Sequence, residues 1–461
     1  MSLGKRQSQQ QDLFVATTDL PTAPGHPFYC KLNQLLTEAG FDAWIEEQCA
    51  PYYADTLGRP SIPPGVYFRM ILVGYFEGIA SQRGIAWRCS DSRSLSTFLG
   101  FGVTEATPDH SSLSRIHQRL PLEIHEKAFI FVLEIAQKKG LLDGQTIAVD
   151  STTLEANAAM KSITRKDTGE DWQAYLRRLA AEAGLENPTT EELRRFDQKR
   201  KDKKVSNTEW QSPADPDSRI APLKDGRTHL AYKAEHAVDL GSEFVIGVQV
   251  TPADKGDADT LVDAILGAQI NLALAGSEQE IEEAVADKGY HSAETLVACE
   301  QCNTRPYIPE PRKRWRRRWQ DKPARHKQAV YANRRRVRGQ RSKRLQRLRS
   351  EYAERSFAHV CETGGSRRCC LRGLARVTKR YLLQVAARNL GLLMRKLFGI
   401  GTARSLQKGL VCLYALMLLI LSALGRWTAC IRYLCRIPAF MPHTMSHMFV
   451  MRDKGGYSTG C

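Results

Sequence analysis

The chain has 461 residues, of which 42% are hydrophobic and 25% are charged, enough apolar material for about two or three folded domains rather than a disordered chain. Lys and Arg number 67 against 50 Asp and Glu, so the formal net charge is +17 and the first partner to consider is a polyanion, either nucleic acid or an anionic membrane surface. The 12 cysteines are too dilute for a disulfide scaffold, which excludes the small secreted domains that depend on one.

The front of the chain predicts a flexible lead-in followed by helices. Residues 1–30 are rich in Gln, Thr and Pro and hold no apolar stretch flanked by basic residues. We therefore expect no secretory signal and a cytoplasmic protein. Apolar residues then recur at helical spacing over Leu32–Trp44 and over Val66–Ile79, which predicts two helices.

Two more helices are predicted before the pattern changes. In the segment "TPDHSSLSRIHQRL", Asp109 or Ser111 can accept hydrogen bonds from the first amides of a helix. The next helix is expected over Leu122–Lys139 and ends at Gly140. Residues 31–140 are therefore predicted to form a helical N-terminal domain.

Strand patterns begin after this point. "QTIAVDST" is a short β-branched run that ends in an acid, typical of a buried strand. Residues 154–227 are polar, charged and interrupted by "SPADPDS", so we interpret them as an insertion. "HLAYKAEHAVDL" and "EFVIGVQV" then alternate, which predicts an antiparallel hairpin through Gly241.

The remaining elements alternate between helices and strands. A helix is predicted over Asp257–Leu274, followed by the strand "EEAVAD", which ends at Asp287. Another helix follows Ser292, and "RPYIP" is a last short strand. This order implies a mixed sheet covered by helices, and thus an α/β domain over residues 141–400.

A strongly basic segment precedes the last predicted helix of this domain. Residues 312–349 hold 18 Lys and Arg against one Asp, with Trp315 and Trp319 among them. From about Arg335 the pattern predicts a helix that continues past Glu354. A run of this kind is often only a solvated face, but the density favours contact with nucleic-acid phosphates.

Two aspartates stand at the ends of predicted strands, where open α/β sheets usually carry their sites. If the strands that end at Asp150 and Asp287 are parallel neighbours, their ends lie about 4.8 Å apart. Two carboxylates so placed can share one hard cation. A third carboxylate from a helix, for which Glu354 is the candidate, allows two ions about 3.5–4 Å apart. The alternative is that each aspartate only caps the turn that follows it.

Several segments together resemble a known family, the bacterial insertion-sequence transposases of the DDE type with a Tyr-Arg-Glu signature. The resemblance covers about residues 25–405. It is carried by "TPDHSSLSRIHQRL", "IAVDSTTLEANA", "SPADPDSRIAPLKDGRTHLAYKAEHAVDL", "VADKGYHS" and "EYAERSFAHVCETGG". It implies an RNase-H-like mixed sheet flanked by helices, whose first and fourth strands are adjacent and parallel.

The resemblance also implies an activity. Asp150, Asp287 and Glu354 match the family's catalytic, metal-binding positions, so Mg²⁺ or Mn²⁺, as two ions, is the expected cofactor. The implied reaction cleaves DNA at the ends of an insertion sequence and joins the freed 3′-hydroxyl to target DNA. Double-stranded DNA, as terminal inverted repeats and target, is then the partner. A homodimer or higher assembly on DNA and a location at the bacterial nucleoid are expected.

The chain departs from the family at the third acid. The common signature is Tyr, two residues, Arg, three residues, Glu, six residues, Lys. Here Arg349 precedes Glu354 by one residue too many, and Cys361 stands at the Lys position. Arg347 and Glu351 satisfy the spacing, so Glu351 is the rival third ligand, although "ERSFAH" favours Glu354.

Other residues are expected to contact DNA, with a plain solvated surface or a polar turn as the alternative for each. The candidates are Lys288 and Tyr290 after the second acid, Arg115 and Arg119 in the helical domain, and Arg334, Arg335, Arg347 and Arg349 in the basic segment.

Residues 401–461 form a predicted apolar helical tail. The uncharged stretch Gly409–Gly425 has 17 residues and spans about 26 Å as a helix, short of the roughly 30 Å hydrocarbon layer. A buried or oligomer-forming helix is therefore favoured over a membrane span.

Two other functions share these sequence features. One is a transposase-derived DNA-binding protein that has lost catalysis, to which the disturbed spacing at Arg349 points. The other is an RNase-H-like nuclease that cuts DNA but never joins strands.

Overall fold

A computed structural model of the chain describes Ala16 and residues 25–404, apart from residues 55–57, 59, 186, 202–205, 224–225 and 313–318. The described residues belong to one compact unit, which ends at Ser405. The predicted apolar tail, with the stretch Gly409–Gly425, lies outside the described residues, as does Trp315. None of the helices within the described ranges is both long enough and apolar enough to cross a membrane.

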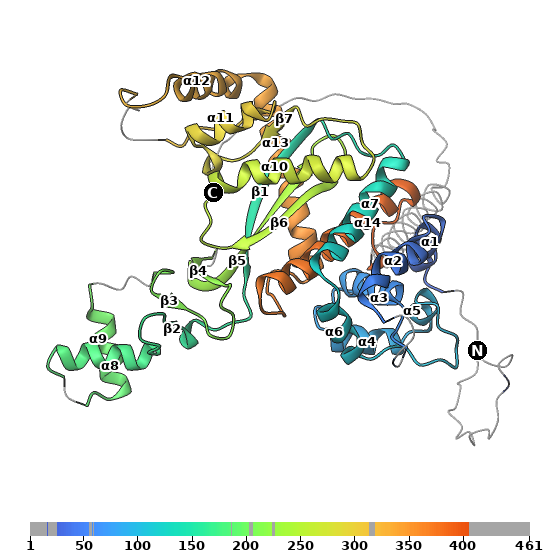
Figure 1. Ribbon diagram of the computed structural model, residues 1–461, viewed down its shortest axis with the longest axis horizontal. Helices are drawn as coiled ribbons and strands as arrows, with labels where there is room; N and C mark the ends of the chain where they lie inside the picture. Colours follow the sequence, from blue (N-terminus) through green and yellow to red (C-terminus); the bar gives the residue numbers. More distant parts are fainter. Residues whose placement is uncertain are drawn as a thin grey trace, which may run out of the picture. The chain divides into compact units, whose positions relative to one another are not determined.

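The N-terminal part of the unit is helical, as predicted (Figure 1). Its helices are α1 Pro27–Glu38, α2 Phe41–Cys49, α3 Pro64–Glu77, α4 Gln82–Ser90, α5 Arg93–Phe98, α6 His110–Arg119 and α7 Leu122–Lys138. Helix α3 lies at the centre of this part, because all its residues between the first and the last are buried.

Two details of the N-terminal helices test the sequence patterns. The single helix expected over Leu32–Trp44 is two helices, because Gly40 between them has a φ of 70°, a left-handed conformation that suits glycine. The cap expected at Asp109 is confirmed, since its carboxylate accepts hydrogen bonds from the amides of Ser111 and Ser112 at 2.7 and 3.1 Å.

A mixed sheet forms the centre of the second part. Its strands are β1 Thr146–Glu155, β4 Arg219–Pro222, β5 Thr228–Asp239, β6 Val245–Pro252, β7 Glu283–Val285 and β8 Arg305–Tyr307. The order runs β6, β5, β1, β7, β8, with β4 also paired to β5. Strand β5 is antiparallel to β1 and β6, whereas β1, β7 and β8 are parallel to one another. The predicted hairpin, the adjacent parallel first and fourth strands and the α/β fold class are thus confirmed.

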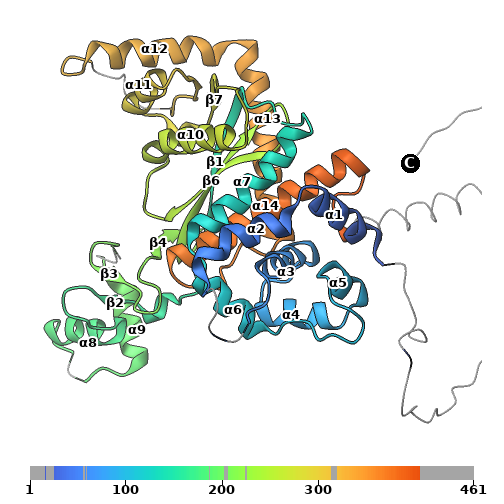
Figure 2. The ribbon, with the colours of Figure 1, turned by 45° about the vertical axis from the view of Figure 1, so that its right-hand side comes forward.

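Helices cover the two faces of this sheet (Figures 1 and 2). They are α10 Asp257–Leu274, α11 Ala293–Gln301, α12 Ala324–Arg338, α13 Gln340–Phe357 and α14 Leu374–Phe398, with a π-helical turn at Ala358–Thr363. Helix α10 approaches β6 closely at Gly247, where an added Cβ would lie 3.1 Å from the Cβ of Ala268. The basic helix expected from Arg335 is instead two helices, α12 and α13, because the backbone of Gly339 is extended.

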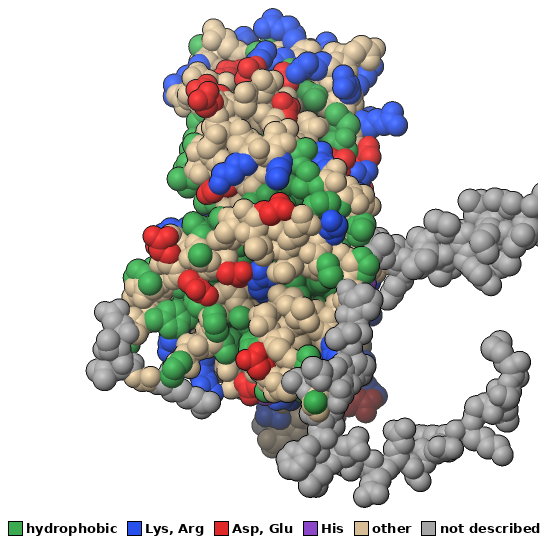
Figure 3. Space-filling model, turned by 90° about the vertical axis from the view of Figure 1, so that its right-hand side faces the viewer, with side chains coloured by type: hydrophobic (Ala, Val, Ile, Leu, Met, Phe, Trp, Pro, Cys, Tyr) green, Lys and Arg blue, Asp and Glu red, His purple; other side chains and the backbone are tan. Residues whose placement is uncertain are grey.

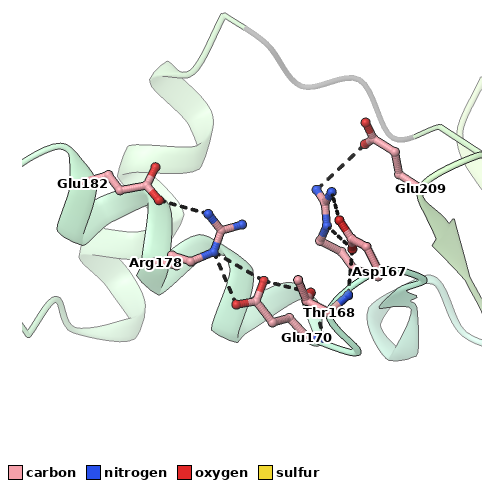
Figure 4. Close-up of polar contacts among 7 residues, drawn as sticks. Asp167, Thr168, Glu170, Arg178, Glu182 and Glu209 are labelled. Carbon is pink, nitrogen blue, oxygen red and sulfur yellow. Dashed lines mark hydrogen bonds and ion pairs between the residues drawn. The ribbon is translucent and has the colours of Figure 1, made fainter.

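The segment 154–227 carries structure that the sequence reading missed. It holds the short strands β2 Thr164–Arg165 and β3 Trp210–Gln211 and the helices α8 Trp172–Glu182 and α9 Thr190–Lys199. The two helices bury Leu176, Ala180 and Leu193 between them. Figure 4 shows Arg178 of α8 between Glu170 and Glu182, with nitrogen–oxygen distances of 3.3 and 2.9 Å. The boundaries of the insertion and of the domains stay predictions.

Candidate active site

Asp150 and Asp287 lie side by side because β1 and β7 are parallel. Ala148 of β1 is paired with Val285 of β7. Asp150 and Asp287 each follow these paired residues by two positions. Asp287 follows the end of β7 and accepts a hydrogen bond from the amide of Gly289 at 2.7 Å. Asp150 stands in the middle of β1 and not at its end, because pairing with β5 extends β1 to Glu155.

The carboxylate of Asp150 is part-buried and faces α13. It accepts hydrogen bonds from the guanidinium of Arg349 at 2.8 Å and from the amide of Ser151 at 2.9 Å. Burial raises the pKa of Asp150, the Arg349 charge opposes that rise, and the charges of Asp287 and Asp257 add to it. Two further carboxylates therefore lie close enough to affect Asp150.

Helix α13 is held against the sheet by hydrogen bonds that fix its rotation. The side-chain amide of Gln346 donates to the carbonyl oxygens of Ala286 and Tyr307, at 3.1 and 2.8 Å. One face of the helix further along carries Ser356, whose hydroxyl lies 2.9 Å from Nδ1 of His236 on β5. These contacts orient the arginine that reaches Asp150.

The two candidate glutamates of α13 are not in contact with the paired aspartates. Glu354 is exposed and accepts a hydrogen bond from the Ser350 hydroxyl at 3.1 Å. Glu351 is exposed and lies 2.5 Å from Arg355. Within the described ranges, no group of three or more His, Cys, Asp or Glu is arranged to hold a metal ion. The assignment of Glu354 as third acid, with Glu351 as its rival, stays a prediction.

A different carboxylate, which the sequence reading missed, lies beside Asp287. Asp257 is the first residue of α10, and its Oδ1 is 2.7 Å from Lys233 Nζ and 3.1 Å from the Ser151 hydroxyl. Its Oδ2 lies 2.8 Å from the point where a Cβ on Gly289 would stand, and Oδ1 of Asp287 lies 2.9 Å from that point. One oxygen of Asp257 is thus tied to the sheet, and the other lies beside Gly289, as does an oxygen of Asp287.

A signal for Asp257 was present in the sequence. Lys233 interrupts the apolar strand "HLAYKAEHAVDL" and is only 5% exposed. A lysine in a buried strand requires an acidic partner. An acid in the first turn of a helix, by contrast, is ordinarily explained by the helix dipole, which hid the role of Asp257.

The residues after Asp287 divide between core and surface. Lys288 is exposed, and its contact with DNA stays a prediction. Tyr290 is 1% exposed and donates a hydrogen bond to Glu235 at 2.6 Å. The contact of Tyr290 with DNA stays a prediction, and in this structure its buried hydroxyl already has a carboxylate partner.

The basic segment contains both paired and exposed arginines. Arg334 makes two hydrogen bonds with Glu310, at 2.8 and 2.9 Å, and Arg349 is held by Asp150. Helix α12 lies at the top of the molecule in Figure 1, and Figure 3 shows Lys and Arg side chains gathered at the top of the face that it draws. The exposed cations of α12 and α13 include Arg335, Arg338, Lys343, Arg344 and Arg347.

The remaining sequence-predicted DNA contacts lie on the helical part. The guanidinium of Arg115 donates to the hydroxyl of Ser111 at 2.9 Å. The guanidinium of Arg119 lies over the ring of Tyr53, 4.9 Å from its centroid. Neither contact is an ion pair, so both charges can still interact with phosphate.

Comparison with protein families identifies the chain. The family described as "Transposase domain (DUF772)" matches residues 19–119, and the family described as "Transposase DDE domain" matches residues 141–390. Because the second match covers more than half of the 461 residues, the chain belongs to the DDE transposase family. Its members are enzymes of DNA transposition, which in general use divalent metal ions.

Two further comparisons add less. No curated protein matches the chain. A solved structure titled "Mos1 transposase paired-end complex with left transposon end" is similar over 68% of this chain and 82% of that one, with 10% sequence identity and a TM-score of 0.18. So low a TM-score supports no argument about this chain.

Proposed function

We propose that this transposase cleaves DNA at the ends of an insertion sequence and joins the freed 3′-ends to target DNA, with Asp150 and Asp287 as the centre of its active site. The observation that carries the proposal is the parallel register of β1 and β7, which brings the two aspartates together inside the part of the chain that matches the DDE domain. Because the reaction joins two element ends, we expect two or more chains to act on one DNA.

The carboxylates fit a divalent cation such as Mg²⁺ or Mn²⁺. The available donors are carboxylate oxygens, which hard cations prefer, and one or two carboxylates are usual for Mg²⁺. Asp257 and Asp287 each have an oxygen within 2.9 Å of the point where a Cβ on Gly289 would stand, so the two carboxylates are near each other and a cation bound by both would reduce their repulsion. A bound divalent cation would stabilise the negative charge that builds up on phosphate oxygens during cleavage.

The protein's own residues set the charge at the site. Arg349 neutralises part of the Asp150 charge, and Lys233 does the same for Asp257. Because Asp257 and Asp287 each have an oxygen within 2.9 Å of the Cβ position of Gly289, we propose Asp257 as a carboxylate of the site. Glu354 or Glu351 would complete it after a rearrangement of side chains on α13 when DNA binds.

The exposed cations of α12 and α13 are the proposed path for the DNA backbone. Helix α13 carries Lys343, Arg344 and Arg347 as well as Arg349, so phosphates along its outer side would lie near the aspartate pair. Arg335 and Arg347 are among the candidates, because both are exposed and no ion pair with a carboxylate is found for either within the described residues.

The deciding experiment measures metal-dependent cleavage of DNA that carries the ends of the element encoding this chain. We expect Asp150→Asn and Asp287→Asn each to lower the cleavage rate by more than about 100-fold. Asp259→Asn, an exposed acid in the first turn of α10, is the matched control and should cleave normally. Normal cleavage by either of the first two variants would refute the assignment.

The same assay selects the third acid and tests strand joining. Loss of cleavage in Glu354→Gln but not in Glu351→Gln supports Glu354 as the third acid, as the sequence favours. The reverse result would assign that role to Glu351. Binding of Mn²⁺, followed by electron paramagnetic resonance, separates loss of the cation from loss of DNA binding. Products with the cleaved end covalently joined to a plasmid distinguish a transposase from a nuclease.

A further inference from the structure

A small pocket lies where the end of α13, the π-helical turn after it and the end of α14 meet. Helix α3 and the residues that follow α14 complete its walls. The pocket holds about 20 Å³, room for about one water-sized group, and it is partly open to solvent. None of the three aspartates near β1 and β7 lines it, so the pocket is distinct from the candidate active site.

The walls of the pocket carry basic side chains and no acidic one. The basic side chains are those of Arg355 on α13, His359 in the π-helical turn, and Arg388 and Arg395 on α14. Two acids lie nearby, but Glu243 and Glu351 both pair with Arg355, at 2.7 and 2.5 Å. No ion pair with a carboxylate is found for Arg388 or Arg395 among the residues that the structure describes. The pocket therefore carries positive charge that neighbouring acids do not balance.

Arg388 is a buried cation with unused donors. It is 5% exposed, and its Nη1 donates to the carbonyl oxygen of Glu243 and to Oδ1 of Asn389, at 2.5 and 3.2 Å. No hydrogen bond of its Nε or Nη2 is found within the described ranges, and neither nitrogen is closed off from solvent, so both are accessible from the pocket. Burial lowers the pKa of Arg388 to about 10, and the guanidinium stays charged at neutral pH. A buried cation of this kind favours an anionic ligand.

Tyr75 of α3 adds a neutral donor to the same pocket. Its side chain is 2% exposed, no hydrogen bond of its hydroxyl is found in the described part of the chain, and the hydroxyl is not closed off from solvent. Burial raises the pKa of Tyr75, and the charges of Arg388 and Arg395 oppose that rise, so both guanidinium groups lie near the hydroxyl. The Arg395 guanidinium lies against Gly401, where an added Cβ would stand 2.8 Å from its Nε. The absence of a side chain at Gly401 thus leaves room for Arg395 beside the pocket.

The donors select the kind of anion that fits. They come from α3 and from two successive positions along α14, and the several charged oxygens of a tetrahedral oxyanion can accept hydrogen bonds from all of them. Arginine also matches the charge and geometry of a phosphate. A base or a sugar is too large for the pocket, so a ligand enters with a phosphate oxygen and keeps its other atoms at the open side.

We propose that this pocket binds one phosphate group through the hydroxyl of Tyr75 and the guanidinium groups of Arg388 and Arg395. The group has two sources, a phosphodiester of the DNA backbone or a free phosphate ion. The first source rests on the proposed function, whereas the second does not. Arg355 follows Arg349 by six residues on α13, about 9 Å along the helix axis. A DNA strand at the aspartate pair spans that distance in a few nucleotides, because its phosphates are about 3.4 Å apart along the duplex axis.

The test uses a histidine of the pocket as a reporter. His359 is half-buried, and burial together with the arginine charges lowers its pKa, so the neutral imidazole that reacts with diethyl pyrocarbonate is present at pH 7. Mass spectrometry of peptides follows its modification. His26, half-buried at the start of α1 and outside the pocket, is the internal control. The probes added to the full-length protein are sodium phosphate, sodium acetate at the same ionic strength, and a DNA duplex that carries the ends of the element.

Three variants make the protection specific. Tyr75→Phe removes one hydroxyl and keeps the ring, Arg395→Ala removes an exposed cation of the pocket, and Arg376→Ala removes an exposed cation of the same helix outside the pocket. We expect the probe concentration for half-protection of His359 to rise about ten-fold in Arg395→Ala and about five-fold in Tyr75→Phe. It should stay unchanged in Arg376→Ala. Thermal melting checks that each variant is folded.

Each outcome has one meaning. Protection of His359 by phosphate supports a free ion as the ligand, and protection by the duplex at much lower concentration assigns the pocket to a DNA phosphate. Absence of protection by both, equal protection by acetate, or an unchanged half-protection concentration in Tyr75→Phe and Arg395→Ala would overturn the proposal. Asp150→Asn keeps the pocket intact, so loss of cleavage with retained protection of His359 separates failure of the active-site assignment from failure of this one.

Discussion

The two faces of the sheet bury polar side chains of different kinds. On the face covered by α10, Lys233, Glu235 and Asp257 are charged groups in contact: Lys233 Nζ lies 2.7 Å from Asp257 and 3.8 Å from Glu235. On the face covered by α13, His236 lies between the hydroxyls of Ser356 and Tyr381, at 2.9 Å from each. Burial lowers the pKa of His236 to about 3, so this second network is neutral at physiological pH.

Both networks start from neighbouring positions of one strand. Residues 233 and 235 of β5 point to one face and residue 236 to the other, because side chains alternate along a strand. The charged network leads to a carboxylate at the candidate active site, whereas the neutral network holds the helix that carries Arg349 and the two glutamates. We infer that the first face sets the charge of the site and the second sets its geometry.

The largest expected effect comes from Lys233→Met, which removes the only cation among these contacts of the charged face. Glu235, 3% exposed, and Asp257 then lose their shared partner, so we expect the free energy of unfolding to fall by about 3 kcal/mol. Chemical denaturation of the variant measures the change. Lys255→Met, at an exposed position just before α10, is the control.

A double variant sharpens this result. Lys233→Met with Asp257→Asn removes one of the two unpaired acids, so part of the lost stability should return. A double variant as unstable as the sum of the single ones would show that Lys233 does not act through this ion pair.

The next effect concerns Asp257→Asn, which keeps the hydrogen bonds to Lys233 and Ser151 but removes the charge. If Asp257 is a carboxylate of the site, Mn²⁺ affinity and the cleavage rate should each fall by about 10- to 100-fold. The exposed Asp259→Asn should leave both unchanged. Normal Mn²⁺ binding by Asp257→Asn would restrict this residue to a structural role with Lys233.

The aspartate pair was predictable, because short-range patterns locate it. A short run with apolar residues before each aspartate identifies a buried strand, and the alternation of elements makes β1 and β7 parallel neighbours. The prediction that Asp150 ends its strand was less accurate. The length of β1 depends on pairing with β5, about 80 residues later in the chain. The helices of the insertion were missed because a charged composition conceals their small core at Leu176, Ala180 and Leu193.

The rest of the site depends on contacts between distant segments. Asp257 gains its role from Lys233 on β5, and no local pattern joins the two. The choice between Glu351 and Glu354 depends on the rotation of α13, which Gln346 and Ser356 set through the sheet. A spacing rule along the sequence cannot report that rotation.

The neutral face makes a prediction about pH. The pKa of His236 is about 3 in the folded protein, below the 6.5 of an unperturbed histidine, so the folded state binds fewer protons than the unfolded state below pH 6.5. Its contribution to stability is therefore complete above pH 6.5 and is lost as the pH falls toward 3, by up to about 1.4 kcal/mol per pH unit.

The His236→Gln variant isolates this contribution, since glutamine can still bond both hydroxyls. Between pH 6.5 and 5, where few carboxylates titrate, its stability should depend less steeply on pH than that of the wild type. Some slope will remain, because burial also lowers the pKa of His117 to about 3 and that of His125 to about 4. An unchanged slope would show that His236 is not kept neutral by burial.

The smallest expected effect is that of Ser356→Ala, which removes one neutral hydrogen bond to His236. We expect the free energy of unfolding to fall by about 1 kcal/mol, since both groups are buried and an imidazole nitrogen loses its partner. Ser350→Ala, six residues earlier on α13, removes a hydroxyl whose hydrogen bond within the described ranges is to the exposed Glu354, and it should change stability little. If the neutral face positions α13, Ser356→Ala should also lower the cleavage rate. The rate should fall at a temperature where the variant remains folded, so that the small loss of stability does not explain the effect. Normal cleavage by Ser356→Ala would leave Gln346, and not the His236 network, as the contact that orients Arg349 toward Asp150.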